Sequence, residues 1–396
     1  MHLLLIADTF PPLNNSGAVQ LWDLALQFKE AGHQLTVVVA SPQIKYPWVV
    51  ESVQGIRVLR VKTQKLKDVP YIRRGLGELI MPFKMMRCLK SLSLDRFCWD
   101  GILWYSPSIF FGPLIHHLKK KNDCRTYLII RDIFPEWAFD MGLIKNGPLY
   151  YLLKKIAKYQ YALADTIGIQ TPGNEKYFLE WKSGKNRHLE VLHNWITPSA
   201  NQGCSIRLSH SPLAGRFFFV YAGNLGIAQN VNVFLDLAIL LKDRTDIGFL
   251  FVGRGSELTS LKDKAFTNKL NNVLFADELD SREIPGLYAQ CHAGMIALDQ
   301  RHQSHNIPGK FLTYLSAGLP VLAQVNLNND LVKIIESHKI GQVNLSYSTS
   351  ELLQKSLELV NQVRSDNGMP ERCREVSRKL FSTQAAAKQI TAALTR

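Results

Sequence analysis

The first feature of the sequence that could do chemistry is a lysine at the start of a predicted helix. Residues 306–323 read NIPGKFLTYLSAGLPVLA, and an apolar stripe at helical spacing follows the lysine. Backbone N–H groups point outward from the first turn of a helix, and the helix dipole favours negative charge there. We therefore expect Asn306, Pro308, Gly309 and Lys310 to form a seat for a phosphate.

Two glycine-rich turns in the same half of the chain follow apolar strands. Gly223 and Asn224 come after the run 216–222, and Arg254 lies between two glycines, the first of them Gly253. Glycine lets the backbone approach a ligand closely, and an exposed guanidinium suits a diphosphate. An ordinary surface turn remains the alternative for Arg254. If both strands belong to one sheet, Arg254 and Lys310 converge on a nucleotide diphosphate that needs no metal.

The first half of the chain offers a weaker phosphate or sugar signal near its start. Asn14, Asn15, Ser16 and Gly17 form the loop between the first strand and the first helix. Small residues there allow close approach of a ligand to the backbone. Packing of the loop explains the same residues equally well.

Charged and polar side chains also follow two later strands of the first half. Arg131 and Asp132 come directly after TYLII, and Glu136 follows within one turn. His193 and Asn194 end the last strand before the expected linker. We expect them to face a donor sugar or an acceptor, with ion pairing at the sheet edge and a purely structural role as the alternatives.

Several classes of protein lose support from what the sequence lacks. It contains no G-x-S-x-G, Walker A or H-E-x-x-H motif and no metal-ligand cluster. The six cysteines are scattered without a C-x-x-C, which is typical of reduced thiols in a cytoplasmic protein. The N-terminal MHLLLIADTFPP reads as a buried strand rather than a signal peptide, and no apolar run approaches the ~18 residues of a membrane helix.

Alternating strands and helices must position these residues. Apolar strands are expected within 3–10, 33–41, 55–61, 101–105, 126–132, 165–171 and 188–194, and the pattern restarts at 216–226 and 247–257. Such alternation predicts parallel sheets covered by helices on both faces. Because 198–213 is rich in Ser, Pro and polar residues, we interpret it as a linker. We predict two doubly wound, Rossmann-like α/β domains, 1–200 and 205–375, facing across a cleft that the motif residues line.

The net charge of +14 is concentrated in the first half, where 26 Lys and Arg face 16 Asp and Glu within residues 1–200. Its densest part, 62–90, interleaves basic residues with Leu, Ile, Met and Phe. This mixture suits an anionic membrane surface. A solvated helix pair that covers a core is the alternative. A nucleic-acid site has less support, because the sequence contains no helix-turn-helix, RNP or zinc-finger pattern.

Taken together, the motifs resemble those of family 4 glycosyltransferases, which have the GT-B fold. The resemblance rests on DTFPP, SG and GH in the first half, and on GNLG, FVGRGSE and PGKF with YLSAGLPV in the second. RDIFPEW and GNLGIAQ look most like the WbuB-like branch, which includes transferases of N-acetyl-L-fucosamine in bacterial O-antigen or capsule assembly. The resemblance implies an N-terminal acceptor-binding domain, a C-terminal donor-binding domain, and a last helix at about 376–396 that crosses back onto the first domain.

The same resemblance implies an activity and its partners. It implies retaining transfer from a UDP-sugar, without a required metal, to a sugar linked to undecaprenyl diphosphate. The protein is then expected in the cytoplasm, peripherally on the inner face of the cytoplasmic membrane. A UDP-sugar 2-epimerase of the same architecture and a non-catalytic nucleotide-sugar-binding module remain as alternatives.

The sequence departs from the family at residues that matter for catalysis. The two acids of the E-x7-E motif fall on His305 and Thr313, so a single hydroxyl replaces the usual ribose ligand. The family's Arg and Lys after the first strand of the second domain fall on Asn224 and Gln229. Phosphate binding is therefore expected from Arg254 and Lys310. The family's catalytic His falls on Arg131 or beside it on Asp132. The expected catalytic residues are therefore Arg131, Asp132, Arg254 and Lys310, and no general base is assigned.

Overall fold

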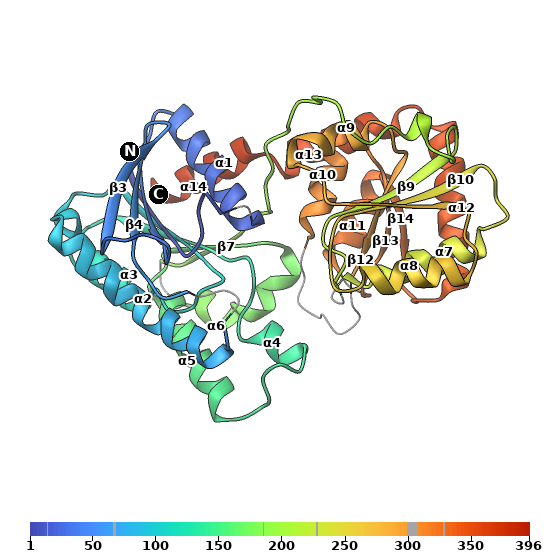
Figure 1. Cartoon of the computed structure of the whole chain (residues 1–396). Helices are drawn as coiled ribbons and strands as arrows, with labels where there is room; N and C mark the ends of the chain where they lie inside the picture. Colours follow the sequence, from blue (N-terminus) through green and yellow to red (C-terminus); the bar gives the residue numbers. More distant parts are fainter. Residues whose placement is uncertain (14, 66–68, 185, 227–228, 299–306, 328) are drawn as a thin grey trace. The chain divides into compact units, whose positions relative to one another are not determined.

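The protein forms two compact units, shown in a computed structural model that describes residues 1–396 except 14, 66–68, 185, 227–228, 299–306 and 328 (Figure 1). Within the described residues, unit 1 comprises 1–195 and 383–396, and unit 2 comprises 196–298 and 307–382. Each unit is an open α/β sheet covered by helices.

Unit 1 is built on an eight-stranded sheet in the order β3-β4-β2-β1-β5-β6-β7-β8. The strands are β1 (His2–Ala7), β2 (Gln34–Ala40), β3 (Trp48–Val53), β4 (Ile56–Val61), β5 (Gly101–Tyr105), β6 (Arg125–Ile129), β7 (Thr166–Ile169) and β8 (His188–Val191). The helices are α1 (Ser16–Glu30), α2 (Tyr71–Ser91), α3 (Gly112–Lys119), α4 (Glu136–Asp140), α5 (Pro148–Ala162), α6 (Leu179–Lys182) and α14 (Thr383–Leu394).

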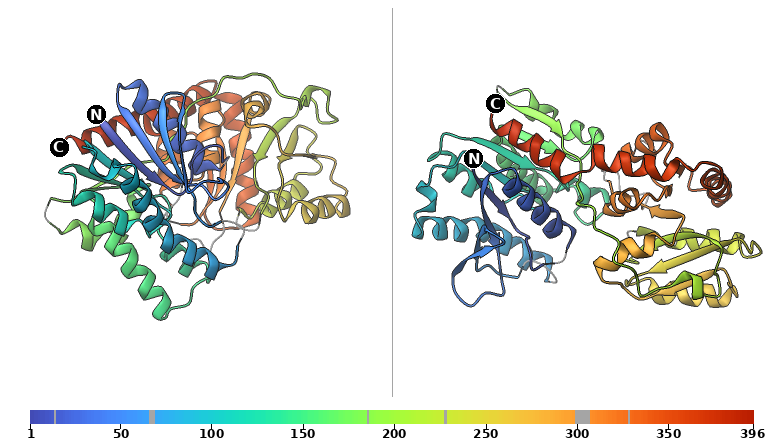
Figure 2. Two further views of the ribbon diagram at one scale, coloured as in Figure 1. Left: turned by 60° about the vertical axis from the view of Figure 1, so that its left-hand side comes forward. Right: turned by 90° about the horizontal axis from the view of Figure 1, so that it is seen from above.

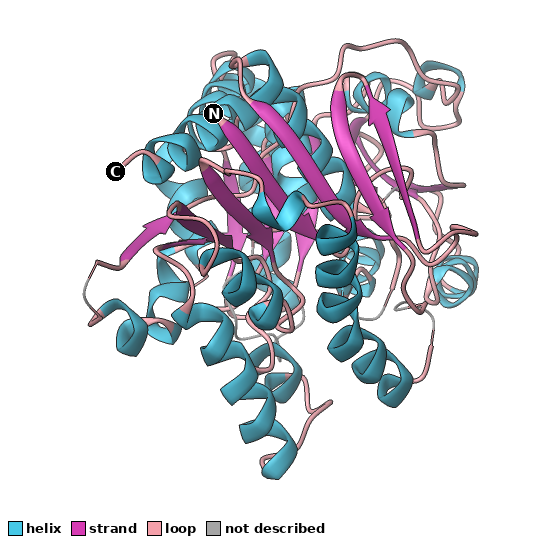
Figure 3. Cartoon of the chain, turned by 90° about the vertical axis from the view of Figure 1, so that its left-hand side faces the viewer, coloured by secondary structure: helices cyan, strands magenta, loops and turns pink. Residues whose placement is uncertain are grey.

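Both faces of this sheet are buried, as the apolar strands of the sequence require. Alternate residues of β1 contribute to two separate cores: Leu3 and Leu5 pack with α1 and α14, whereas Leu4 and Ile6 pack with α2, α3 and α5. Because side chains alternate across a strand, a strand buried on both faces is apolar along its whole length. The helices on both sides of the strands are visible in Figure 3.

One edge of the sheet differs from the predicted all-parallel arrangement. β3 pairs antiparallel with β4, while the other strand pairs of the sheet are parallel. Gln54 and Gly55 join the two strands, and both have positive φ (49° and 81°). Two successive residues of this kind form the tight turn that matches hairpin twist. Residues 71–91 form the single helix α2, whereas the alternative interpretation of 62–90 was a pair of helices.

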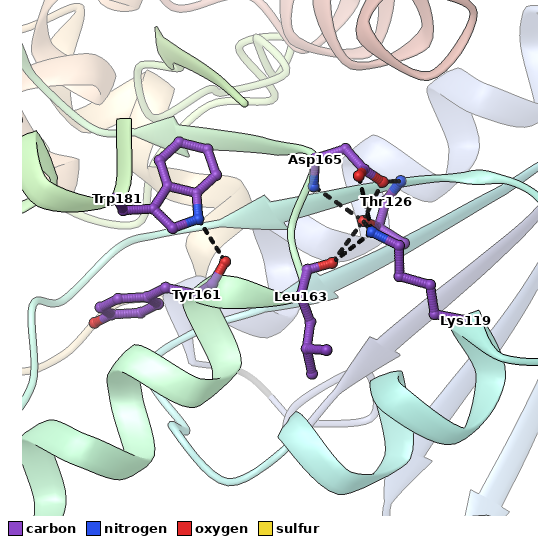
Figure 4. Close-up of polar contacts among 6 residues, drawn as sticks. All are labelled: Lys119, Thr126, Tyr161, Leu163, Asp165 and Trp181. Atoms are coloured by element: carbon purple, nitrogen blue, oxygen red, sulfur yellow. Dashed lines mark hydrogen bonds and ion pairs between the residues drawn. The ribbon is translucent and has the colours of Figure 1, made fainter. Parts of the chain in front are cut away.

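A polar network holds the amino ends of β6 and β7 together (Figure 4). The Asp165 carboxylate accepts hydrogen bonds from the Thr126 hydroxyl (2.7 Å) and backbone N–H (2.9 Å), and it pairs with the Lys119 ammonium (2.8 Å). Lys119 also donates to the carbonyl oxygen of Leu163, just after α5. The network ties α3 and the end of α5 to β6 and β7. It lies at the amino ends of these strands, on the edge opposite to their carboxyl ends.

The C-terminal helix α14 lies beside α1 in unit 1 (Figures 1 and 2). Ile390 is fully buried in the same core as β1 and α1. Gln389 donates a hydrogen bond to the carbonyl oxygen of Val191, at the end of β8. The last 14 residues therefore complete a core whose other members come from the first 195.

Unit 2 is built on a six-stranded parallel sheet in the order β11-β10-β9-β12-β13-β14. The strands are β9 (Phe217–Ala222), β10 (Ile247–Val252), β11 (Val273–Ala276), β12 (Ala293–Ala297), β13 (Val321–Gln324) and β14 (Gly341–Asn344). The helices are α7 (Asn232–Leu240), α8 (Leu258–Thr267), α9 (Ile284–Tyr288), α10 (Gly309–Ala317), α11 (Asp330–His338), α12 (Thr349–Ser365) and α13 (Met369–Leu380).

The segment interpreted as a linker packs instead on unit 2. Leu208 and Leu213 are buried in the core of that unit, with exposed fractions of 4% and 2%. The backbone N–H of Ile196 donates to the carbonyl oxygen of Phe381 (2.8 Å). Scattered apolar residues in a polar segment were sufficient to anchor it, and composition alone did not indicate this.

Three absences hold for the described part of the chain. None of its helices combines the length and the apolar character needed to cross a membrane. Its His, Cys, Asp and Glu side chains form no group of three or more that could hold a metal ion. The six cysteines form no disulfide.

Two turns at the carboxyl edge of unit 2 pack backbone against backbone. Gly223 donates to the carbonyl oxygen of Val252 (2.9 Å), and Leu225 donates to that of Arg254 (2.8 Å). A Cβ atom on Gly253 would clash with the carbonyl oxygen of Gly223, and the φ of Gly253 is +136°. A side chain at this position is therefore excluded by both sterics and backbone conformation.

We predict that Gly253→Ala destabilises unit 2 by about 2–4 kcal/mol, because it adds backbone strain to overpacking. Hydrogen–deuterium exchange should report faster exchange in β9 and β10, with unit 1 unchanged. Gly75→Ala is the matched control, since Gly75 lies inside α2 with no atom within 4 Å of its added Cβ. Equal, negligible effects of the two substitutions would contradict the packing described.

Candidate functional site

The topology of unit 2 marks one place on its sheet for ligand binding. The chain leaves β9 toward β10 and β11 on one side, and β12, β13 and β14 lie on the other. Ligands of open α/β sheets bind outside the carboxyl ends of the strands at such a switch point. The Gly223 turn follows β9, and α10 is the first helix described after β12.

Tyr314 fixes α10 across these two strands. Its hydroxyl donates to the carbonyl oxygens of Val220 in β9 (3.1 Å) and Met295 in β12 (3.4 Å). Its ring lies against Gly294, where a Cβ atom would clash with it. One helical turn before Tyr314, Lys310 is thereby brought to the edge of β9.

The Lys310 ammonium lies in a neutral environment within unit 2. Its nitrogen is 4.7 Å from the ring centre of Tyr221, a cation–π contact. A Cβ atom on Gly223 would approach the Lys310 Cε to 2.8 Å, so the glycine makes room for the lysine. Among the described residues no carboxylate pairs with Lys310, and burial lowers the pKa of Lys310 to about 8. A half-buried cation without a counter-charge is suited to an anionic ligand.

The start of α10 adds backbone donors to this cation. Pro308 is the N-cap residue and supplies no side-chain acceptor, and Gly309 is the first helical residue and is exposed. The first N–H groups of such a helix lack intrahelical partners and favour an anion. Asn306 and His305 lie outside the described residues.

Thr313 uses its hydroxyl within the helix. The Oγ1 donates to the carbonyl oxygen of Lys310 (2.9 Å), and the side chain also contacts Tyr288. Its proton is therefore engaged, which leaves Thr313 as an acceptor for any further ligand group.

Arg254 differs from Lys310 in its environment. Its side chain is 81% exposed, and its Nε pairs with Glu278 at 2.9 Å. Asn224 is exposed and donates from Nδ2 to Oε1 of Gln229 (3.2 Å). The two positions that correspond to the family's Arg and Lys thus hold two neutral side chains, which are hydrogen-bonded to each other. Lys310 is the cation of this group that is not paired with a carboxylate within the described residues.

In unit 1, the corresponding strand-end region lies at β1 and β5. Asn15 caps α1, because its Oδ1 accepts from the N–H of Ala18 (3.0 Å) and its side chain also bonds to Thr9. Ser16 begins the helix, and Gly17 is buried with its Cα facing the Tyr105 hydroxyl. A Cβ atom on Gly17 would be 3.1 Å from that hydroxyl. The glycine therefore allows close packing of α1 on the end of β5.

Arg131 is a buried cation beside this region. It is 7% exposed, its Nη1 donates to the carbonyl oxygen of Leu192 (2.9 Å), and its guanidinium lies 4.4 Å from the centre of the Trp195 ring. Nε and Nη2 have no hydrogen-bond partner among the described residues. Burial lowers the pKa of Arg131 to about 10, although the neighbouring Tyr105 opposes this. The guanidinium is thus buried with only part of its hydrogen-bonding capacity used, next to the Tyr105 side chain.

The other residues expected from the sequence have separate environments in unit 1. Asp132 is exposed next to Arg131. Glu136 begins α4 and lies 3.5 Å from the Lys154 ammonium, and burial raises the pKa of Glu136. The Nδ1 of His193 donates to the carbonyl oxygen of Gln170 (2.9 Å), and Asn194 is buried. Glu136 is thereby tied to α5 rather than to Arg131.

Sequence reasoning missed three aromatic side chains that position the charged ones. Tyr221 lies under Lys310, while Tyr105 and Trp195 lie against Arg131. Tyr105 and Tyr221 are at or next to the carboxyl end of a strand, and Trp195 follows β8 by a few residues. Tyr221 and Trp195 are close in sequence to residues already singled out. The position of these aromatic residues near strand ends was the signal available in the sequence. An aromatic residue at such a position is nevertheless interpreted as part of the core until its partner cation is located.

Part of the chain is similar in sequence to known glycosyltransferases. Residues 216–361 match the model of the family described as glycosyl transferases group 1. A probable glycosyltransferase, WbjE of Pseudomonas aeruginosa, is 24% identical over 220 residues, which are 54% of this chain and 54% of WbjE. The match therefore spans about half the length of that curated relative.

Solved structures show the same fold over the whole chain. A UDP-forming α,α-trehalose-phosphate synthase from Burkholderia xenovorans superposes with a TM-score of 0.75 at 11% identity, covering 100% of this chain and 98% of the other. WaaG, a glycosyltransferase involved in lipopolysaccharide biosynthesis, gives a TM-score of 0.64 at 13% identity, with 99% of each chain covered. The fold is GT-B, as predicted.

If UDP binds at Lys310, as the sequence predicts, the lowered pKa of Lys310 determines how that affinity depends on pH. The ammonium is charged below about pH 8 and loses its proton as the pH rises through that value, so the dissociation constant of UDP should increase by about tenfold between about pH 7 and pH 9.5. The diphosphate of UDP is already ionised at about pH 7 because the second pKa of a phosphate is about 6. Isothermal titration calorimetry measures the effect. Lys310→Met should give a flat profile, and parallel profiles for the two proteins would refute the assignment.

Proposed function

We propose that this chain, which has the GT-B fold and whose residues 216–361 match the group 1 glycosyl transferases, is a retaining glycosyltransferase that uses a UDP-sugar donor. The observation that carries the proposal is the half-buried Lys310, which lies beside Gly223 and Tyr221 at the switch point of unit 2 without a carboxylate partner in the described residues. Unit 2 would bind the donor, and unit 1 would bind the acceptor.

Lys310 would act on the charge that develops as the donor reacts. The bond between the anomeric carbon and the β-phosphate oxygen breaks, and its electron pair stays on the phosphate. The acceptor hydroxyl oxygen forms the new bond on the same face, and its proton passes to the departing phosphate oxygen. A fixed cation and helix N–H groups at the phosphate stabilise the departing UDP more than the intact donor. Arg254, on its exposed turn, would add a second charge, and no metal would be required.

Other contacts to the donor follow from the same geometry. Gly223, Asn224 and Gly253 would let the diphosphate approach the backbone, together with Pro308, Gly309 and the N-terminus of α10. Thr313 would accept a hydrogen bond from a ribose hydroxyl. In unit 1, Ser16 and Gly17 would contribute the start of α1.

Unit 1 would supply the remaining groups of the reaction. Arg131 has two unpartnered donors for an oxygen of the donor sugar or acceptor. Asp132 and His193 would complete its surroundings, with Glu136 and Asn194 as supporting residues. His193 donates from Nδ1 to a carbonyl, so in the neutral ring its Nε2 is an acceptor.

The acceptor we propose is a saccharide linked to undecaprenyl diphosphate, at the inner face of the cytoplasmic membrane. Two features of unit 1 support a membrane surface: basic and apolar residues gather on α2, and exposed Leu149, Tyr151 and Leu152 gather on α5, which also bears Lys154 and Lys158. WaaG is involved in lipopolysaccharide biosynthesis, and we propose a comparable pathway, O-antigen or capsule assembly, for this chain. The proposed sugar is N-acetyl-L-fucosamine, from the resemblance to the WbuB-like branch.

The test is release of UDP from a panel of UDP-sugars that includes UDP-N-acetyl-L-fucosamine. Each donor is incubated with and without a lipid-diphosphate-linked N-acetylhexosamine. We expect release from one donor that depends on the acceptor. Conversion of the donor without acceptor would instead identify a 2-epimerase, and UDP binding without turnover of any donor would identify a binding module.

We predict that Lys310→Ala lowers turnover by about 10²–10³-fold, the range for loss of one charge-stabilising donor, with a smaller change in donor KM. Steady-state kinetics with the active donor separates the two parameters. Lys333→Ala, on α11, is the control for loss of one positive charge in unit 2. Unchanged turnover with only a higher KM would contradict the role given to Lys310.

A further inference from the structure

Unit 1 contains a second cationic site that the proposed reaction does not use. A cavity of about 260 Å³ lies between the edge hairpin and α2. Trp48 and Val61 line it from the hairpin strands, and Lys62 follows directly. Lys84, Arg87 and Cys88 line it from α2. Three cations and a tryptophan therefore surround one small volume.

Among the residues that the structure describes, no acidic side chain lines this cavity. Lys84 and Arg87 form no ion pair with any residue that the structure describes, and Lys62 donates to the carbonyl oxygen of Lys45 (2.9 Å). The acids closest along the two elements are engaged elsewhere, since Glu51 pairs with Arg60 and Glu78 pairs with Arg74. Three like charges without a counter-ion repel one another, and a phosphate would relieve that repulsion.

The outward side of α2 extends the site with apolar side chains. Leu76, Leu79, Ile80 and Phe83 are 54%, 46%, 39% and 51% exposed. Their spacing places them on one helical face, which also carries Arg87 and Lys90. The opposite face of the helix, with Met81, Met85 and Leu89, is buried in the core. An exposed face that mixes large apolar residues with cations is typical of helices that lie at a lipid interface.

Figure 1 shows α2 on the outside of unit 1, next to α3. The helix buries its inner face against the sheet and leaves the apolar outer face without a partner from the described parts of unit 1. Charge complementarity selects the occupant: the cations suit a negatively charged surface, and the exposed Leu, Ile and Phe suit acyl chains.

We propose that the Trp48–Lys62–Lys84–Arg87 cavity binds the phosphate of an anionic phospholipid headgroup while the outer face of α2 enters the adjoining interface. This headgroup site would contribute to the membrane association that the proposed function includes, and its biological purpose rests on that function. It adds a defined headgroup site to what would otherwise be a diffuse attraction between charges.

The experiment measures binding of the full chain to vesicles of phosphatidylcholine alone and of phosphatidylcholine with an equal amount of phosphatidylglycerol. Lys84→Gln combined with Arg87→Gln removes two cations from the cavity. Arg73→Gln combined with Lys90→Gln removes the same charge from the same helix outside the cavity. We expect the first pair to weaken binding to the anionic vesicles by about tenfold more than the second, because charge-assisted hydrogen bonds are lost in addition to general attraction.

Equal losses from the two pairs would overturn the headgroup site, as would full binding by the Lys84→Gln/Arg87→Gln protein. Ile80→Ser combined with Phe83→Ser should weaken binding to both kinds of vesicle, and retained binding would refute entry of α2 into the interface. Unfolding temperatures verify that each variant is folded.

A soluble phosphate is the competing occupant of the cavity. If inorganic phosphate or glycerol phosphate binds the free chain through Lys84 and Arg87, while the wild-type and Lys84→Gln/Arg87→Gln proteins bind anionic vesicles equally, the lipid assignment is overturned. Vesicle binding requires no sugar transfer. Cavity-dependent binding by a chain that fails the UDP-release test would therefore reject the proposed reaction and leave the headgroup site standing.

Discussion

The contact of α10 with β9 and β12 is the constraint on which the geometry of unit 2 depends. Tyr314 is fully buried, fills the space over Gly294, and donates to carbonyl oxygens of both strands. Because these strands lie on either side of the topological switch, the helix spans the one place where the sheet edge divides. The position of Lys310, and hence of its charge, follows from that anchor.

Both units hold a cation at a strand end by means of neutral groups. Lys310 lies over Tyr221, and Arg131 lies over Trp195 with one hydrogen bond to a carbonyl oxygen. Burial disfavours the charged form of each, as their lowered pKa values indicate. A carboxylate at either position would stabilise the cation more but would also neutralise it. The aromatic partners hold each cation in position without neutralising its charge.

The outer faces of α2 and α5 in unit 1 are not accounted for by core packing. Core packing accounts for the inner faces of α2 and α5, whereas the outer faces retain Leu, Ile, Phe and Tyr side chains that no described part of the unit covers. The edge hairpin β3–β4 places Trp48 and Lys62 opposite α2, and this arrangement creates the cationic cavity. A structural deviation from an all-parallel sheet thus produces a site that the strand pattern did not suggest.

The sequence alone determined the fold class and the positions of most strands, because a strand buried on both faces must be apolar throughout, as in 2–7 and 217–222. It also placed Lys310 at the start of a helix, since Pro308, Gly309 and the apolar stripe are local signals. Tertiary structure alone decided which side chains meet. The pairing of Lys310 with Tyr221, the burial of Arg131 against Trp195, and the engagement of Arg254 with Glu278 join residues from different elements. Local residue patterns carry no information about such partners, because their distances are set by the packing of helices on the sheet.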